Sequence, residues 1–132
     1  MINSFLKKLM GKKDKTKLRT KTIIFVDERW EVRQTINTLL TKNGYNVILA
    51  AGNGECIEKL RKVKPNLLLI GYVTTRGKIL DYVKKIKKTR VAYLITDESE
   101  EEHLELYENV IGFLKGSDNI NVFLKKIKQL LK

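Results

Sequence analysis

Short apolar runs alternate with stretches of helical periodicity along the chain from Thr22 onward. Residues 67–70, Leu-Leu-Leu-Ile, have no polar position, which is typical of a parallel strand that is covered on both faces. The pattern predicts strands at 22–26, 45–50, 66–71, 91–96 and 110–114, and helices at 30–42, 54–63, 78–88, 98–107 and 119–131. The last helix has the clearest apolar face, made of Ile120, Phe123, Leu124, Ile127 and Leu131, and a capping residue is expected among Ser117, Asp118 and Asn119.

Strict alternation of strands and helices is the pattern of βαβ units. It predicts an α/β fold in which a five-stranded parallel sheet is doubly wound, a flavodoxin-like (βα)5 arrangement with strand order 2-1-3-4-5. In such a sheet, functional side chains gather at the carboxyl ends of the strands, here of the first, third and fourth. We expect one domain over residues 22–132, preceded by an extension over residues 1–21.

Composition agrees with a single domain, since 132 residues with 42% hydrophobic content can bury a core. Of the net charge of +12, the extension carries a large part, because residues 1–21 contain eight Lys or Arg against Asp14 alone. This excess favours an anionic partner. The single cysteine, Cys56, cannot form an intramolecular disulfide, and no secretory or membrane-spanning run is recognisable, so a cytoplasmic location is expected, with peripheral membrane contact as an open addition.

Apolar residues recur at helical spacing in the extension, with lysines mostly off that stripe; they are Ile2, Phe5, Leu6, Leu9 and Met10. A basic amphipathic helix of this kind can lie on an anionic membrane or dock in a partner's groove. Packing of the stripe on the domain itself is the third alternative, and the sequence leaves all three open.

Three segments resemble the receiver (CheY-like) domain of bacterial two-component response regulators. They are Ile-Ile-Phe-Val-Asp-Glu at 23–28, Gly-Tyr-Asn-Val at 44–47 with Ala-Gly-Asn-Gly-Glu at 51–55, and Lys-Pro-Asn-Leu-Leu-Leu-Ile at 64–70. The resemblance covers nearly all of the chain after residue 21. It implies that an acidic pair and an aspartate ending the third strand hold Mg²⁺, that this aspartate accepts a phosphoryl group, and that a hydroxyl and a lysine respond to it.

The chain departs from that pattern at the phosphoacceptor. Asp27 and Glu28 match the acidic pair and Thr96 matches the hydroxyl, but the acceptor position is Gly71, which has no side chain to attack a phosphoryl donor. Lys115 stands one residue before the expected lysine, so its side chain is predicted to point to the other face. The resemblance therefore implies a degenerate receiver, a pseudo-receiver.

No metal site or cofactor is expected, because two carboxylates without a third protein ligand leave most of the coordination of Mg²⁺ to water. Whether weak Mg²⁺ binding survives at Asp27 and Glu28 is open. Lys115 and Arg76 are alternative candidates to neutralise repulsion within this acidic pair, and Thr96 is expected to cap the helix at 98–107.

Four other residues are candidates for a metal site, a reactive thiol or a contact surface. His103 has no second His or Cys at ligand spacing and is interpreted as a surface residue, while Cys56 is interpreted as a small buried hydrophobe. Trp30 and Tyr72 lie beside the degenerate pocket, where each is either an interaction surface or partly buried packing.

The leading hypothesis is a phosphorylation-independent signalling module that binds an unidentified protein partner, with a membrane tether through the extension; it is not an enzyme. The alternative is a regulatory protein that binds nucleic acid through the extension and a basic patch of Lys84, Lys85, Lys87, Lys88 and Arg90. A small enzyme or ligand binder is disfavoured, because Asp27-Glu28-Arg29 replaces the glycine-rich phosphate loop that would follow the first strand. The sequence does not decide between a monomer and a homodimer.

Overall fold

The computed structural model describes residues 20–86, 88–97, 104 and 109–132. Within these ranges the strands form one parallel sheet in the order β2-β1-β3-β4-β5. The strands are β1 (Thr22–Val26), β2 (Asn46–Ala50), β3 (Leu67–Ile70), β4 (Val91–Ile95) and β5 (Val110–Lys115). The helices are α2 (Trp30–Lys42), α3 (Asn53–Lys62), α4 (Arg76–Ile86) and α5 (Ile120–Leu130). The predicted doubly wound α/β fold and its strand order are confirmed.

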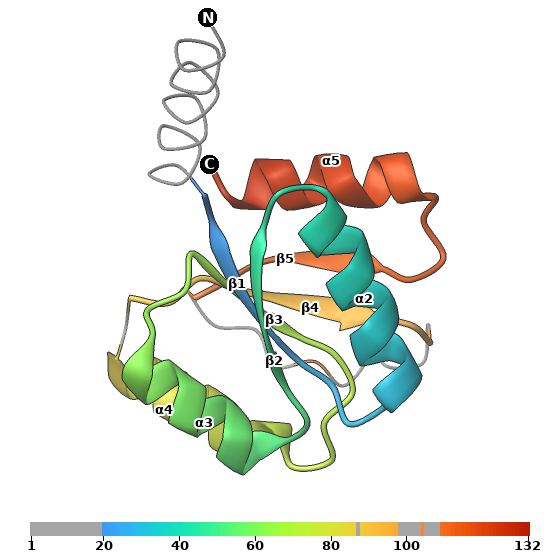
Figure 1. Cartoon of the computed structure of the whole chain (residues 1–132). Coiled ribbons are helices and arrows are strands. Elements are labelled where there is room, and N and C mark those ends of the chain that lie inside the picture. Colours follow the sequence, from blue (N-terminus) through green and yellow to red (C-terminus); the bar gives the residue numbers. More distant parts are fainter. Residues whose placement is uncertain (1–19, 87, 98–103, 105–108) are drawn as a thin grey trace, which may run out of the picture.

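Two layers of helices cover the sheet: α3 and α4 pack on one face, and α2 and α5 on the other (Figure 1). Consecutive residues of β1 alternate between the two cores, since Ile24 and Val26 pack toward α3 and α4 whereas Ile23 and Phe25 pack toward α2 and α5. All four side chains are fully buried. Burial on both faces explains why β3 contains no polar residue.

Strands β2 and β3 each begin one residue later than the sequence predicts. Asn66 lies outside β3, and its side-chain oxygen accepts a hydrogen bond from the Thr22 amide at 2.8 Å. Tyr45 lies outside β2, because its amide donates back to Leu40 at the end of α2. Gly44 makes this connection with a φ of 89°, a conformation that favours glycine.

The amphipathic pattern of α5 is correct for most of its apolar face but wrong for Ile120. Phe123, Ile127 and Leu131 are buried, and Leu124 packs partly against the same core. Ile120 is 61% exposed, because it lies in the first turn, beyond the edge of the sheet that the rest of the helix covers. Asn119 caps the helix, as one of the three expected residues: its side chain accepts a hydrogen bond from the Val122 amide at 2.9 Å.

Several expectations lie outside the described residues. They are the apolar stripe of the extension, the helix at 98–107 with His103, and Lys87 of the basic patch. None of the helices within the described ranges has the length and apolar character that a membrane span requires.

The N-terminal cap of α5 gives a stability prediction. Replacing Asn119 by Ala leaves the Val122 amide without its acceptor, and the free energy of unfolding should fall by about 1 kcal/mol. Urea denaturation followed by circular dichroism measures this loss. Asn121→Ala, in the same exposed turn but with no capping bond, is the matched control and should change stability little.

Candidate functional site

The candidate site lies at the carboxyl ends of three adjacent strands. Asp27 follows β1, Gly71 follows β3 and Thr96 follows β4. The chain winds in opposite directions on either side of β1 and β3, so the loops after these two strands diverge and leave room for side chains between them. The sequence-predicted residues are therefore brought to one edge of the sheet.

Asp27 has no exposed surface, and both of its carboxylate oxygens are fully engaged. Oδ1 accepts from the backbone amide of Arg29 at 2.8 Å and from its Nε at 3.0 Å. Oδ2 accepts from Nη2 of Arg29 at 2.8 Å and from the Tyr72 amide at 3.0 Å. The forked, two-point contact of a guanidinium with a carboxylate is among the strongest polar contacts in proteins.

Arg29 also contacts residues that follow the two other strands. Its Nη1 donates to the hydroxyl of Thr96 at 2.7 Å, and its guanidinium carbon lies 5.5 Å from the centre of the Tyr72 ring. The side chain is 32% exposed, so one side of the guanidinium faces solvent. A single cation thus connects the ends of β1, β3 and β4.

Gly71 is buried, and the space beside its Cα is occupied. A Cβ atom at this position would lie 2.1 Å from Oδ2 of Asp27, which is far inside van der Waals contact. The Gly71 amide donates to the carbonyl of Val26 at 2.8 Å, which holds its backbone against β1. Any side chain at position 71 therefore requires Asp27 to leave its present hydrogen bonds.

Glu28 is separated from Asp27 by its partners. Its carboxylate accepts from the amide of Thr74 at 3.1 Å and from the Thr74 hydroxyl at 2.5 Å, in the loop after β3. Its own amide donates to the carbonyl of Tyr72 at 2.8 Å. The two carboxylates are held by different groups and do not form the joint acidic pair that the sequence suggests.

These contacts do not fit a Mg²⁺ site. Mg²⁺ requires several oxygen ligands at close range, whereas the oxygens of Asp27 already accept four hydrogen bonds and a guanidinium lies against them. Within the described part of the chain, no cluster of three or more His, Cys, Asp or Glu side chains is arranged to hold a metal ion.

Sequence reasoning missed Arg29, the residue that organises the site. The sequence offered Lys115 or Arg76 as the cation for the acidic pair, whereas Arg29 is the cation that contacts the carboxylate of Asp27. Arg76 lies over the ring of Tyr93, 5.3 Å from its centre, and Lys115 is exposed at the end of β5. Arg29 stands two positions after Asp27, and only the turn between β1 and α2 brings its side chain back. The one available signal was a basic residue next to an acidic pair.

Trp30 and Tyr72 are exposed beside this network. Trp30 is 62% exposed in the first turn of α2, and Tyr72 is 45% exposed directly after Gly71. Tyr72 does not fill the place of the missing acceptor, because the Asp27 carboxylate occupies it. Thr96 accepts from Arg29, and the helix that it was expected to cap lies outside the described residues.

Cys56 is fully buried between the sheet and α3, as the sequence indicates. Burial, with a smaller contribution from the neighbouring carboxylate of Glu55, raises the pKa of its thiol to about 12. A thiol that stays protonated at neutral pH is a poor nucleophile.

Receiver domains of response regulators are among the known proteins with this fold. The chain matches no family model. Chemotaxis protein CheY of Thermotoga maritima is 30% identical over 69 residues, which is 52% of this chain and 58% of that protein.

Solved structures extend this likeness to the whole fold. Chemotaxis response regulator CheY4 of Vibrio cholerae aligns with a TM-score of 0.66 and 21% identity, over 84% of this chain and 98% of that one. A CheY-like receiver domain protein from Methanospirillum hungatei aligns with a TM-score of 0.71 and 21% identity, over 85% and 94%. The chain therefore has the CheY-like receiver fold.

The ion pair between Asp27 and Arg29 gives a prediction. Arg29→Met leaves a buried carboxylate without its cation, and we expect the free energy of unfolding to fall by about 2 kcal/mol, less than for a fully buried pair because Arg29 is partly exposed. Urea titration followed by the fluorescence of Trp30 measures it, and Asp27→Asn in the same background should restore part of the loss.

Arg61→Met is the matched control, since the guanidinium of Arg61 lies over a tyrosine ring, 5.9 Å from the centre of Tyr82, without a buried carboxylate. Equal losses in the Arg29 and Arg61 variants would contradict the assigned role of Arg29.

Proposed function

We propose that the protein is a pseudo-receiver, a signalling module with the receiver fold that acts by binding a protein partner without being phosphorylated. The observation that carries the proposal is the carboxylate of Asp27 in the space where an acceptor side chain at position 71 would begin. Glycine itself offers no oxygen to a phosphoryl donor. The likeness to chemotaxis regulators supports a place in two-component signalling.

We also propose that the module is held in one conformational state, and the contacts of Arg29 support this. A phosphoryl group and a metal ion would bring charge to the edge of the sheet only transiently. The guanidinium of Arg29 is part of the chain, and its hydrogen bonds to Asp27 and Thr96 connect the ends of β1 and β4 permanently. A partner that binds this edge therefore meets the same surface whatever the phosphorylation state of the cell.

Trp30 and Tyr72 are the proposed contact residues. Trp30 is 62% exposed and Tyr72 45% exposed, both lie beside Arg29, and exposed aromatic side chains contribute strongly to protein interfaces. In this proposal the module has no catalytic residues and uses no cofactor.

Phosphorylation is the direct test. The protein incubated with acetyl phosphate and Mg²⁺ should gain no phosphoryl group by intact-mass spectrometry, and beryllofluoride should leave the fluorescence of Trp30 unchanged. A receiver domain with an aspartate at the acceptor position serves as positive control for both reagents. Incorporation of a phosphoryl group at any carboxylate of this chain, or a saturable fluorescence change, would sink the proposal.

A tether is the second element of the proposed function. The extension combines eight basic residues with an apolar stripe, a combination suited to the interface of an anionic bilayer. Each Lys or Arg near such a surface contributes up to about 1 kcal/mol at low salt. We propose that the extension holds the module at anionic membranes.

Two full-length variants test the tether. Leu6→Asp/Leu9→Asp places charges on the apolar stripe and should abolish co-sedimentation with vesicles that contain phosphatidylserine, whereas Asn3→Asp/Ser4→Asp adds the same charge off the stripe and should retain most of it. Equal weakening of vesicle binding in both variants would show that the extension binds through its charge and not through its apolar stripe. No binding by the unmodified protein would remove the tether and leave the pseudo-receiver proposal intact.

A further inference from the structure

Cations gather at the amino end of the sheet, opposite the candidate site. A cavity of about 210 Å³ opens there, and its lining includes the five basic residues Lys21, Lys64, Lys88, Arg90 and Lys132. They come from four separate places in the chain: the residues before β1, β3 and β4, and the residue after the end of α5. The parallel fold alone brings them together.

No carboxylate side chain is found among the described residues that line this cavity. Carboxylates are found instead at the other end of the sheet, where Asp27 and Glu28 follow β1, Asp97 follows β4 and Asp118 precedes α5. Like charges held near one another repel, so the cavity favours an anionic group that neutralises several of them at once.

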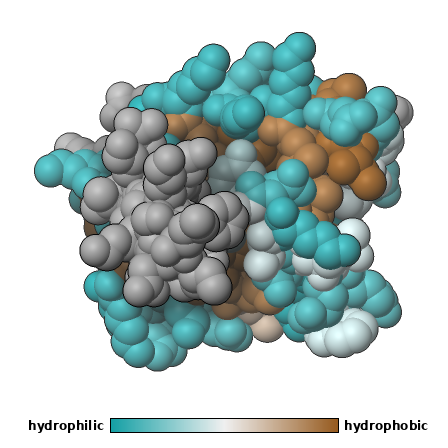
Figure 2. Space-filling model, turned by 45° about the horizontal axis from the view of Figure 1, so that its top comes forward, coloured by the Kyte–Doolittle hydropathy of each residue, from teal (hydrophilic) through white to brown (hydrophobic). Residues whose placement is uncertain are grey.

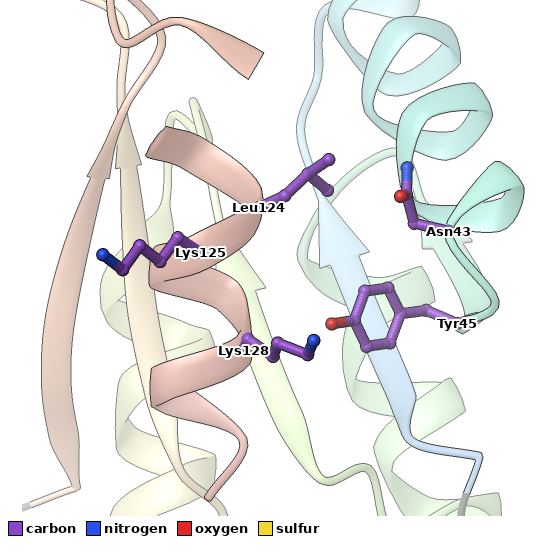
Figure 3. Close-up of a pocket in the computed structure, with 5 residues that line it drawn as sticks. All are labelled: Asn43, Tyr45, Leu124, Lys125 and Lys128. Atoms are coloured by element: carbon purple, nitrogen blue, oxygen red, sulfur yellow. The ribbon is translucent and has the colours of Figure 1, made fainter. Parts of the chain in front are cut away.

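The polar side of α5 extends this basic surface. A second cavity, of about 290 Å³, lies between α5 and the end of α2, and is lined by Asn43, Tyr45, Leu124, Lys125 and Lys128. The ammonium group of Lys128 and the hydroxyl of Tyr45 face each other across it (Figure 3). Partial burial raises the pKa of Tyr45, so its hydroxyl stays protonated and can donate to an anion.

The basic extension joins the domain at this same end. Lys21 lines the cavity and directly precedes β1, so residues 1–19 join the domain beside the five cations. Figure 2, in which the top of Figure 1 comes forward, shows hydrophilic residues over much of the coloured surface and a hydrophobic area at the upper right. The basic sequence of the extension therefore leads directly into the folded domain at Lys21.

A lipid surface fits these observations better than nucleic acid. The extension contains an apolar stripe, which a bilayer interface can take up and a phosphate backbone cannot. Proteins that bind single-stranded nucleic acid interleave aromatic rings with their basic residues, and the described lining of the 210 Å³ cavity contains no aromatic side chain.

We propose that the amino end of the sheet is a docking face for anionic membranes, on which Lys64, Lys88 and Arg90 bind the phosphate and carboxylate groups of lipid heads. This inference rests on the proposed tether and deepens it: the extension inserts its apolar stripe, and the folded domain adds a second, electrostatic contact that orients it. The edge with Arg29, Trp30 and Tyr72 then faces away from the bilayer and stays open to a protein partner.

Charge reversal in the cavity tests the docking face. Full-length Lys64→Glu/Lys88→Glu should bind phosphatidylserine-containing vesicles roughly 30-fold more weakly at low salt, since each lysine near the surface contributes about 1 kcal/mol. Lys78→Glu/Lys115→Glu, which makes the same charge change at two exposed positions near the carboxyl end of the sheet, should lose much less. Thermal unfolding of both variants confirms that they fold.

The outcomes separate this inference from the tether. Equal weakening in the cavity variant and the Lys78→Glu/Lys115→Glu control overturns the docking face. Binding of the cavity variant as strong as that of the unmodified protein, while Leu6→Asp/Leu9→Asp fails to bind, also overturns it. Salt-dependent binding of duplex DNA that the cavity variant loses, without any vesicle binding by the unmodified protein, overturns it in favour of nucleic acid. Loss of binding in the cavity variant alone supports the docking face and removes the tether.

Discussion

The ion pair between Asp27 and Arg29 is the contact on which the carboxyl edge of this sheet depends. A carboxylate without any exposed surface is costly by several kcal/mol unless a cation and hydrogen-bond donors surround it. Arg29 supplies three of the four donors to Asp27, counting its backbone amide, and continues to Thr96. The same pair therefore stabilises a buried charge and connects the ends of β1 and β4. It also takes up the carboxylate oxygens that a metal ion would need as ligands.

The parallel sheet gives the domain two ends of opposite character. Strands of four to six residues separate the ends by only about 15 Å, yet one carries a neutralised carboxylate and the other a group of cations. The helices reinforce this polarity, because their carboxyl ends point toward the basic end and their carbonyls favour nearby cations. Lys64 and Arg90 lie in loops before strands, so the interaction of cations with helix carboxyl ends does not account for their positions.

The sequence predicts the fold well because strands that are buried on both faces appear as runs of apolar residues. Runs such as residues 67–70 can be read directly as central strands, and Asn119 stands where a cap is needed. Ile120 misled the pattern, since periodicity shows which face of a helix is apolar but not where the partner surface stops. The contact of Arg29 with Asp27 could not be predicted, because the turn between β1 and α2 directs the Arg29 side chain, and the spacing of the two residues in the sequence does not reveal that turn. The basic cavity could not be predicted either, since its residues meet only through the sheet topology.

Gly71 also has a consequence for how this chain can change over generations. A substitution that installs an acidic residue there meets the carboxylate of Asp27 at once, and Asp27 cannot withdraw while Arg29 holds it. An acidic residue at position 71 thus needs a second change that frees Asp27 from Arg29. Positions 29 and 71 are therefore expected to change together, because a change at Arg29 alone leaves the buried carboxylate of Asp27 without its cation, and a side chain at Gly71 alone clashes with that carboxylate.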